Sequence, residues 1–187
     1  MTVIGIDIGG SHVGAGLFTE SNGSLQLVRN IESRTVFKTP EELVNSIGRL
    51  TEELVKGDRV MVTHIGIGCP GSTKEGILIS AANFPGWSMV PLATMVGTLW
   101  KTAEVILVND ADAALAAEIC SMKSYATSEN PAPHNVAMIS NYNLTTFLKC
   151  LILFLSAIGT GIGLGLYIMD RFYSGAHGLV EGGHSVL

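Results

Sequence analysis

VIGIDIGGSHVGAGLF, the stretch from Val3 to Phe18, decides the expected fold. Apolar side chains alternate along its first half, which predicts a strand that ends at Ile8. Gly9 and Gly10 then predict a turn, and the residues after them predict a strand returning antiparallel to the first. The chain therefore opens with a predicted β-hairpin.

An acid, two glycines and a hydroxyl meet at the bend of this hairpin. Asp7 lies at the end of the first strand, and Gly9 and Gly10 carry backbone N–H groups that no Cβ shields, so a phosphate can approach them closely. Ser11 adds a hydroxyl. Turn chemistry alone explains the same residue types, because Asp and Gly are common in tight turns. The stretch by itself leaves a phosphate loop and a plain hairpin equally open.

The composition indicates a folded globular chain. Hydrophobic residues make up 47% of its 187 residues, enough for a sizeable core. The net charge is −5 and the sequence has no Lys/Arg cluster, so it lacks the basic surface patch that is typical of nucleic-acid-binding proteins. Three cysteines without CxxC spacing argue against a disulfide framework and favour a reduced, cytoplasmic location. The N-terminus has no basic region of a signal peptide.

Two further elements are predicted after the hairpin. A turn at Asn22-Gly23 and a strand from Leu25 to Glu32 extend the hairpin to three antiparallel strands. Thr39 is expected to cap a helix that starts with a proline, and Glu42 is expected to close a capping box. Apolar residues at helical spacing continue this helix toward a stop at Gly57.

A loop is expected at the end of the next strand, where α/β sheets bind ligands, and a second, aromatic loop follows it. A strand from Arg59 to Gly68 is predicted to end in an irregular loop, GIGCPG, from Gly66 to Gly71. Cys69 in this loop is interpreted as a small apolar turn residue rather than a nucleophile, since no positioned base is evident. NFPGW, from Asn83 to Trp87, is a compact aromatic loop. Its role is either core packing or that of a lid over a ligand.

An Asn-Asp pair follows the next predicted strand, Val105 to Val108. An Ala-rich helix is predicted after the pair, from Ala111 to Met122. Asp110 is either the N-cap of this helix, the commoner role for Asp at such a position, or a general base at the carboxyl edge of a sheet. Asn109 would then donate to a substrate hydroxyl.

A second glycine-rich turn comes after a polar loop and another strand. Tyr125 to His134 is predicted to be the loop and Asn135 to Ile139 the strand. IGTGIGLG, from Ile158 to Gly165, is like the opening stretch a glycine-rich turn between apolar strands with a hydroxyl in its bend. It is a candidate second phosphate loop. Tightly packed strands also collect glycine, so this turn alone is weak evidence.

Five motifs occur in a specific order, and with them the chain resembles a glucokinase-like sugar kinase of the ROK (repressor, ORF, kinase) family. The motifs are DIGGS from Asp7, GIGCPG from Gly66, NFPGW from Asn83, VNDADAALAAE from Val108 and GTGIGLGL from Gly159. The resemblance implies an α/β fold of the actin/hexokinase-type ATPase superfamily. A ribonuclease-H-like mixed-sheet lobe would occupy residues 1–122, and a linker with an incomplete second lobe would occupy residues 123–187.

The same resemblance implies ATP-dependent phosphorylation of a hexose. Asp110 matches the catalytic base, which takes the proton from the sugar hydroxyl that attacks the γ-phosphate, and Asp110 and Asn109 both match sugar-binding positions. Mg²⁺ would bridge the phosphates. The first phosphate loop matches Asp7, Gly9, Gly10 and Ser11, and the second matches Gly159, Thr160 and Gly161.

An E-x-G-H element is implied near the end, where Glu181 and His184 match positions that hold the substrate. His184 also matches a ligand of the family's structural zinc. The CxCGxxGC segment that supplies the other zinc ligands is not in this sequence, and one histidine leaves three positions of a tetrahedral site unfilled. Zinc is therefore expected in the complete family and not on this chain alone. A homodimer is likewise implied for the complete family.

An apolar stretch from Asn141 to Ala157 is interposed where the family passes almost directly from a strand into the second glycine turn. We interpret residues 141–157 as a retained intron or another gene-model fault. Phe147 to Met169 is long enough to span a bilayer. Lys149 and the glycines of this segment argue against that, so no membrane partner is expected.

Functions from different classes compete on this sequence. The first is a hexose kinase that uses ATP, with glucose, N-acetylmannosamine or fructose as the sugar. The alternative is a truncated, catalytically inactive fragment of a sugar kinase that acts at most as a binding module. A transcriptional regulator of the family is disfavoured, because those proteins carry a helix-turn-helix before the first strand and Asp7 lies almost at the start.

Overall fold

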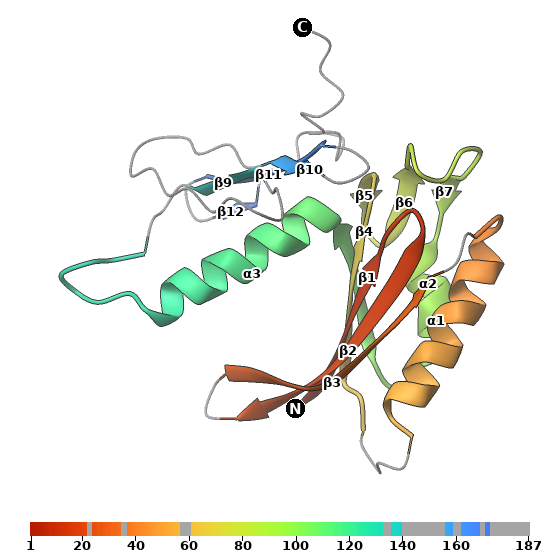
Figure 1. The fold of residues 1–187 in the computed structure, drawn as a ribbon, viewed down its shortest axis with the longest axis horizontal. Helices are drawn as coiled ribbons and strands as arrows, with labels where there is room; N and C mark the ends of the chain where they lie inside the picture. Colours follow the sequence, from red (N-terminus) through yellow and green to blue (C-terminus); the bar gives the residue numbers. More distant parts are fainter. Residues whose placement is uncertain are drawn as a thin grey trace, which may run out of the picture. The chain divides into compact units, whose positions relative to one another are not determined.

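The computed structural model describes residues 1–21, 24–34, 37–56, 61–132, 136–139, 156–158, 162–168 and 171–172. The chain divides into two compact units, Met1–Val108 and Asn109–Leu187 (Figure 1). Strands and at least one helix are present in the described part of each unit. The fold is therefore mixed α/β, as predicted.

A five-stranded mixed sheet forms the centre of the first unit. In it β1 (Thr2–Ile8) pairs antiparallel with β2 (His12–Ser21), which pairs antiparallel with β3 (Ser24–Arg34). On its other side β1 pairs in parallel with β4 (His64–Cys69), and β4 neighbours β8 (Glu104–Asn109). The predicted hairpin and third strand are confirmed, whereas the predicted turn at Asn22-Gly23 lies outside the described residues.

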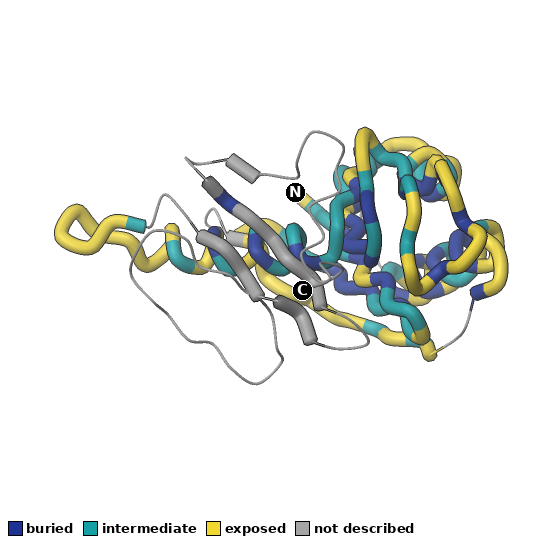
Figure 2. The backbone as a smooth tube through the Cα atoms, turned by 90° about the horizontal axis from the view of Figure 1, so that it is seen from above, coloured by how far each residue is buried: buried dark blue, intermediate teal, exposed yellow. Residues whose placement is uncertain are grey.

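The core of this unit results from the alternation of apolar residues along its strands. Ile4, Ile6 and Ile8 of β1 are no more than 4% exposed, whereas Asp7 between them is exposed. Buried residues are drawn dark blue in Figure 2, where they alternate with more exposed ones along the first unit. The alternation places the isoleucines in the core and leaves Asp7 outside it.

Helix α1 (Pro40–Leu54) covers part of this core and packs against β2 and β3. Thr39 is its N-cap as predicted, because its Oγ1 accepts from the backbone N–H of Glu42 at 3.3 Å. The Glu42 carboxylate accepts from the N–H of Lys38 at 2.8 Å, so the capping box closes one residue earlier than predicted. The helix ends at Leu54, and the predicted stop at Gly57 lies outside the described residues.

The strand predicted from Arg59 to Gly68 has different bounds. Residues 57–60 lie outside the described part of the chain, and strand β4 begins at His64 and continues through Cys69. The glycines of β4 adopt regular strand conformation, because Gly66 pairs with Gly5 of β1 and Gly68 pairs with Asp7. Irregular backbone is therefore limited to Pro70 and Gly71, and the prediction of a loop from Gly66 onward was wrong. Cys69 is fully buried in the strand and is not a turn residue.

A second, three-stranded sheet comes after β4, and sequence reasoning did not predict it. It consists of β5 (Ser72–Lys74), β6 (Ile77–Ser80) and β7 (Ser88–Val90), all antiparallel, with the short helix α2 (Leu92–Gly97) after it. Leu78, Val90 and Leu92 bury their side chains in the core of the first unit. These elements are too short to show a clear hydrophobic period.

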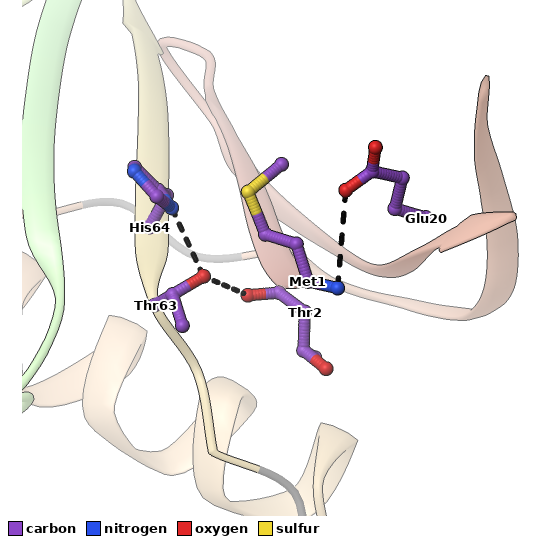
Figure 3. A network of polar contacts seen from close by, with 5 residues as sticks. All are labelled: Met1, Thr2, Glu20, Thr63 and His64. Atoms are coloured by element: carbon purple, nitrogen blue, oxygen red, sulfur yellow. Dashed lines mark hydrogen bonds and ion pairs between the residues drawn. The ribbon is translucent and has the colours of Figure 1, made fainter. Parts of the chain in front are cut away.

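Hydrogen bonds fix the amino ends of β1, β4 and β8 at one edge of the main sheet, and Figure 3 shows the contacts among Thr2, Thr63 and His64. The Thr63 N–H and Oγ1 both donate to the carbonyl of Thr2 at 3.0 Å, and Nδ1 of His64 lies 2.9 Å from the Thr63 Oγ1. The Glu104 N–H donates to the carbonyl of Thr63 at 3.0 Å, which aligns the start of β8 with the start of β4. The carboxyl ends of β1, β4 and β8 consequently share the opposite edge.

The second unit contains helix α3 (Asp110–Ser124) and a sheet of β9 (Val136–Ile139), β10 (Ser156–Ile158), β11 (Ile162–Ile168) and β12 (Arg171–Phe172). All three neighbours of β11 pair with it antiparallel. Leu115 and Ile119 of α3 form a small core with Tyr167 of β11. None of the helices in the described ranges has the length and apolar character needed to cross a membrane.

Candidate functional site

The bend between β1 and β2 is closed by its own hydrogen bond. The Gly9 N–H donates to the carbonyl of His12 at 2.9 Å, so this N–H already has a partner. Within the described residues, the N–H groups of Gly10 and Ser11 donate to no protein acceptor. The N–H groups of Gly10 and Ser11 are therefore the donors at this bend that are best suited to an anion.

Asp7 and His12 face each other across this bend. The Asp7 Oδ2 lies 3.5 Å from the His12 Nε2, with the Asp7 and His12 side chains 63% and 37% exposed. The imidazole lies over Gly9, because a Cβ on Gly9 would overlap its ring atoms. Gly9 thus gives His12 room to reach Asp7, and the carboxylate stays accessible to solvent beside the loop.

Gly10 is covered by a side chain from a distant part of the sequence. A Cβ on Gly10 would stand 2.9 Å from the Asn83 Nδ2 and 3.5 Å from its Cγ. Asn83 belongs to the loop between β6 and β7, so this contact brings two of the predicted ligand loops together. Sequence reasoning identified both loops but did not assign Asn83 as a site residue, because no local pattern records which distant loop a glycine will contact.

The end of β4 is held against the small sheet. Gly71 has a φ of 99°, and a Cβ there would overlap the carbonyl oxygen of Ser80 and stand 2.7 Å from the Ala81 Cα. Only glycine combines this backbone conformation with such a close approach of main chain. Gly71 therefore fixes the turn after β4 to the residues that lead into the Asn83 loop.

The aromatic loop predicted from Asn83 to Trp87 is confirmed, and its aromatic rings serve core packing. Phe84 and Trp87 stack with ring centroids 4.5 Å apart, and both are buried. The Trp87 Nε1–H donates to the Lys38 carbonyl at 3.2 Å, which ties the loop to the start of α1. The rings anchor the loop and leave Asn83 exposed at its beginning.

Asn109 and Asp110 connect β8 to α3. The Asn109 Oδ1 accepts from the N–H groups of Ala111 at 2.8 Å and Asp112 at 3.3 Å, so Asn109 is the N-cap of α3. The N-cap role considered for Asp110 therefore belongs to its neighbour. Asp110 is the first residue of the helix, half-buried, and its Oδ1 accepts from the Ala111 N–H at 2.8 Å.

The remaining predicted site residues lie outside the described part of the chain. They are Gly159, Thr160 and Gly161 of the second glycine turn, and Glu181 and His184 near the end. Among the residues that the structure describes, no group of three His, Cys, Asp or Glu side chains could hold a metal ion. The described candidate residues of the first unit are thus Gly10, Ser11, Asp7 and Asn83, and those of the second unit are Asn109 and Asp110.

Known proteins match this chain in sequence. The family model described as "ROK family" matches residues 3–129. A glucokinase from Thermotoga maritima is 28% identical over 192 residues, which cover 100% of this chain and 51% of that protein. The chain thus spans about half the length of this curated relative.

Solved structures share the fold. A ROK family glucokinase from Streptomyces griseus, in complex with glucose and AMPPNP, matches with a TM-score of 0.68 at 22% identity, over 97% of this chain and 49% of that one. A ROK family transcriptional regulator, a homologue of the E. coli MLC protein, matches with a TM-score of 0.68 at 19% identity, over 96% and 40%. These matches show the actin-like ATPase fold predicted from the sequence. With its family model covering residues 3–129, the chain belongs to the ROK family.

Proposed function

We propose that this chain carries the catalytic machinery of an ATP-dependent hexose kinase, in which Asp110 is the general base. The observation that carries the proposal is the geometry of Asn109 and Asp110, an amide that caps α3 and a carboxylate in its first turn, in a ROK family chain. The related glucokinase from Streptomyces griseus was solved with glucose and AMPPNP. That complex supports a sugar and ATP as the ligand classes.

The proposed reaction is an in-line phosphoryl transfer. A carboxylate oxygen of Asp110 accepts the proton of a sugar hydroxyl, the hydroxyl oxygen forms a bond to the γ-phosphorus, and the bond from that phosphorus to ADP breaks. Asn109 uses Oδ1 as the cap acceptor, so its Nδ2 supplies the donor for a sugar hydroxyl. One amide would thereby anchor the helix and orient the substrate.

The phosphates of ATP would bind at the β1–β2 bend. The N–H groups of Gly10 and Ser11 are suited to phosphate oxygens, and the Ser11 hydroxyl adds a donor of the same kind. Asp7 fits a Mg²⁺ ion, because an exposed carboxylate together with phosphate oxygens is the ligand set that Mg²⁺ prefers. When bound, Mg²⁺ neutralises charge on the phosphates.

The other predicted ligands complete the proposal on the basis of the family resemblance. Gly159, Thr160 and Gly161 would form the second phosphate loop, and Glu181 and His184 would bind the sugar. Of the zinc ligands that the resemblance implies, this sequence holds His184, which lies outside the described residues, and a structural zinc takes four ligands. No step of the proposed reaction depends on zinc.

The experiment that tests this proposal measures sugar phosphate formed from ATP and a panel of glucose, fructose and N-acetylmannosamine. We expect phosphorylation of one of these hexoses, with the preferred sugar showing the largest kcat/KM. Phosphorylation of none of them, under conditions where the glucokinase from Thermotoga maritima is active, would contradict the proposal.

A sugar-binding module without catalysis is the second candidate, and the chain covers 51% of the related glucokinase. The two candidates differ in a binding experiment run beside the assay. A module would bind glucose in calorimetry and form no sugar phosphate, whereas a kinase would do both.

A further inference from the structure

We propose that Asn83 is a further ligand of the transferred phosphoryl group, a role that rests on the proposed kinase function. Its side-chain amide would donate to an oxygen of the γ-phosphate held at the β1–β2 bend. Asn83 would thereby add a donor from the small sheet to those that Gly10 and Ser11 present from the main sheet.

The first argument is the place of the side chain. The amide lies directly on Gly10, since a Cβ on that glycine would stand 2.9 Å from the Asn83 Nδ2 and 3.5 Å from its Cβ and Cγ. The same glycine carries one of the two N–H groups at the bend that have no protein acceptor in the described part of the chain. An anion bound to Gly10 and Ser11 would therefore meet the amide of Asn83 at the edge of the loop.

The second argument is rigidity. Two turns hold the loop, with the Phe84 N–H donating to the Ala81 carbonyl and the Trp87 N–H to the Phe84 carbonyl, both at 3.1 Å. The stacked rings and the bond from Trp87 to Lys38 anchor the end of the loop. Asn83 is therefore presented on a fixed backbone, so little conformational entropy is lost when it binds.

The third argument is the chemistry of the exposed amide. Asn83 is exposed, and among the described residues its amide has no hydrogen-bond partner. No hydrogen bond within the described part of the fold therefore requires a polar side chain at this position. A neutral N–H donor suits a phosphoryl oxygen. An apolar side chain would pack on Gly10 equally well, which makes the amide the informative feature.

The test compares two nucleotides on the 187-residue chain by calorimetry, in the presence of Mg²⁺: AMPPNP, which has a γ-phosphate, and ADP, which lacks one. Because one hydrogen bond to a charged group is lost, Asn83→Ala should weaken AMPPNP binding about tenfold and ADP binding less than about twofold.

Asn83→Asp should weaken AMPPNP binding more than Asn83→Ala does, because the new carboxylate repels the phosphate, and added salt should reduce this additional loss. Ser88→Asp, which adds the same charge elsewhere on the exposed part of the small sheet, is the matched control and should bind AMPPNP like wild type.

Three other outcomes overturn the inference, and they are distinguishable. If wild type and the Asn83 variants bind AMPPNP equally, Asn83 is not a phosphoryl ligand and the proposed kinase function stands. If Asn83→Ala weakens AMPPNP and ADP equally, the side chain supports the loop and does not contact the γ-phosphate. If wild type binds neither nucleotide, the proposed function fails and this inference fails with it. The thermal unfolding midpoint of each variant, expected to stay near that of wild type, shows whether the chain is folded.

Discussion

At the scale of single residues, Asn109 is expected to perform two tasks with the two ends of one amide. Its Oδ1 caps α3 through Ala111 and Asp112, and its Nδ2 is the proposed sugar donor. Asn109→Asp keeps a cap acceptor and removes the donor, so the free energy of unfolding should change by less than about 0.5 kcal/mol. Sugar phosphorylation by this variant should nevertheless fall at least about tenfold, because a bound sugar hydroxyl loses its donor.

Asn109→Ala is the comparison variant, because it removes both ends of the amide. The lost cap should lower the free energy of unfolding by about 1 kcal/mol, measured by urea unfolding followed by circular dichroism. If Asn109→Asp phosphorylates the sugar as well as wild type, the amide donor has no role in substrate binding.

Gly71 is the residue of the site at which a side chain is least tolerated. Its φ of 99° and its approach to Ser80 and Ala81 leave no room for a side chain. Gly71→Ala should lower the free energy of unfolding by about 2 kcal/mol or more, since main chain must move. The measurement is urea unfolding followed by tryptophan fluorescence, which reports on the first unit because both tryptophans lie in it.

Gly66 provides the matched control for that substitution. It lies in β4, three positions before Cys69, and a Cβ there would meet nothing within 4 Å. Gly66→Ala should change the free energy of unfolding by less than about 1 kcal/mol in either direction. Equal effects at Gly66 and Gly71 would show that the turn after β4 is not constrained as described.

At the scale of elements, the aromatic loop is expected to hold Asn83 in place through Trp87. Trp87→Phe keeps a ring against Phe84 and removes the bond to the Lys38 carbonyl, which should cost about 1 kcal/mol of stability. Trp87→Ala also removes the buried ring, which should cost about 3–5 kcal/mol. Trp100 remains as the fluorescence probe for urea unfolding of both variants. A cost below about 1 kcal/mol for Trp87→Ala would mean that the loop is anchored elsewhere.

Elements with strong local patterns could be predicted from the sequence, and those fixed by distant contacts could not. The hairpin around Gly9 and the capped helix from Pro40 each have a clear period and a clear boundary residue, and the strand before Asn109 is a continuous apolar run. The glycines of β4 favour irregular backbone by themselves, yet pairing with β1 overrides that preference. The strands of the small sheet have three or four residues each, too few to show a period.

The candidate site divides in the same way. Sequence order and motif identity pointed to Asp7, Gly10, Asn109 and Asp110 as site residues. Two details follow from the folded structure alone: the Gly9 N–H donates to the His12 carbonyl, and the helix cap is Asn109 and not Asp110. The contact of Asn83 with Gly10 is a third, because it joins residues far apart in the chain.

At the scale of the whole molecule, the chain consists of a first unit, Met1–Val108, and a second unit that begins with the Asn-Asp pair. The lobes expected over residues 1–122 and 123–187, the interposed stretch 141–157 and a homodimer remain predictions. Because the chain covers 51% of the related glucokinase, a chain extended by the rest of the family's length is the natural comparison for activity. If only the extended chain phosphorylates sugar and the 187-residue chain still binds it, the 187-residue chain is a binding module.

The most direct test of the central claim is the rate of sugar phosphate formation by wild type and Asp110→Asn at saturating ATP and hexose. Asparagine keeps the size of the side chain and an oxygen for the Ala111 N–H, but it cannot accept the proton of the sugar hydroxyl. With Asp110 as the general base, kcat should fall about 100- to 10,000-fold, while AMPPNP and sugar still bind. A kcat unchanged by Asp110→Asn in an active enzyme would contradict the account.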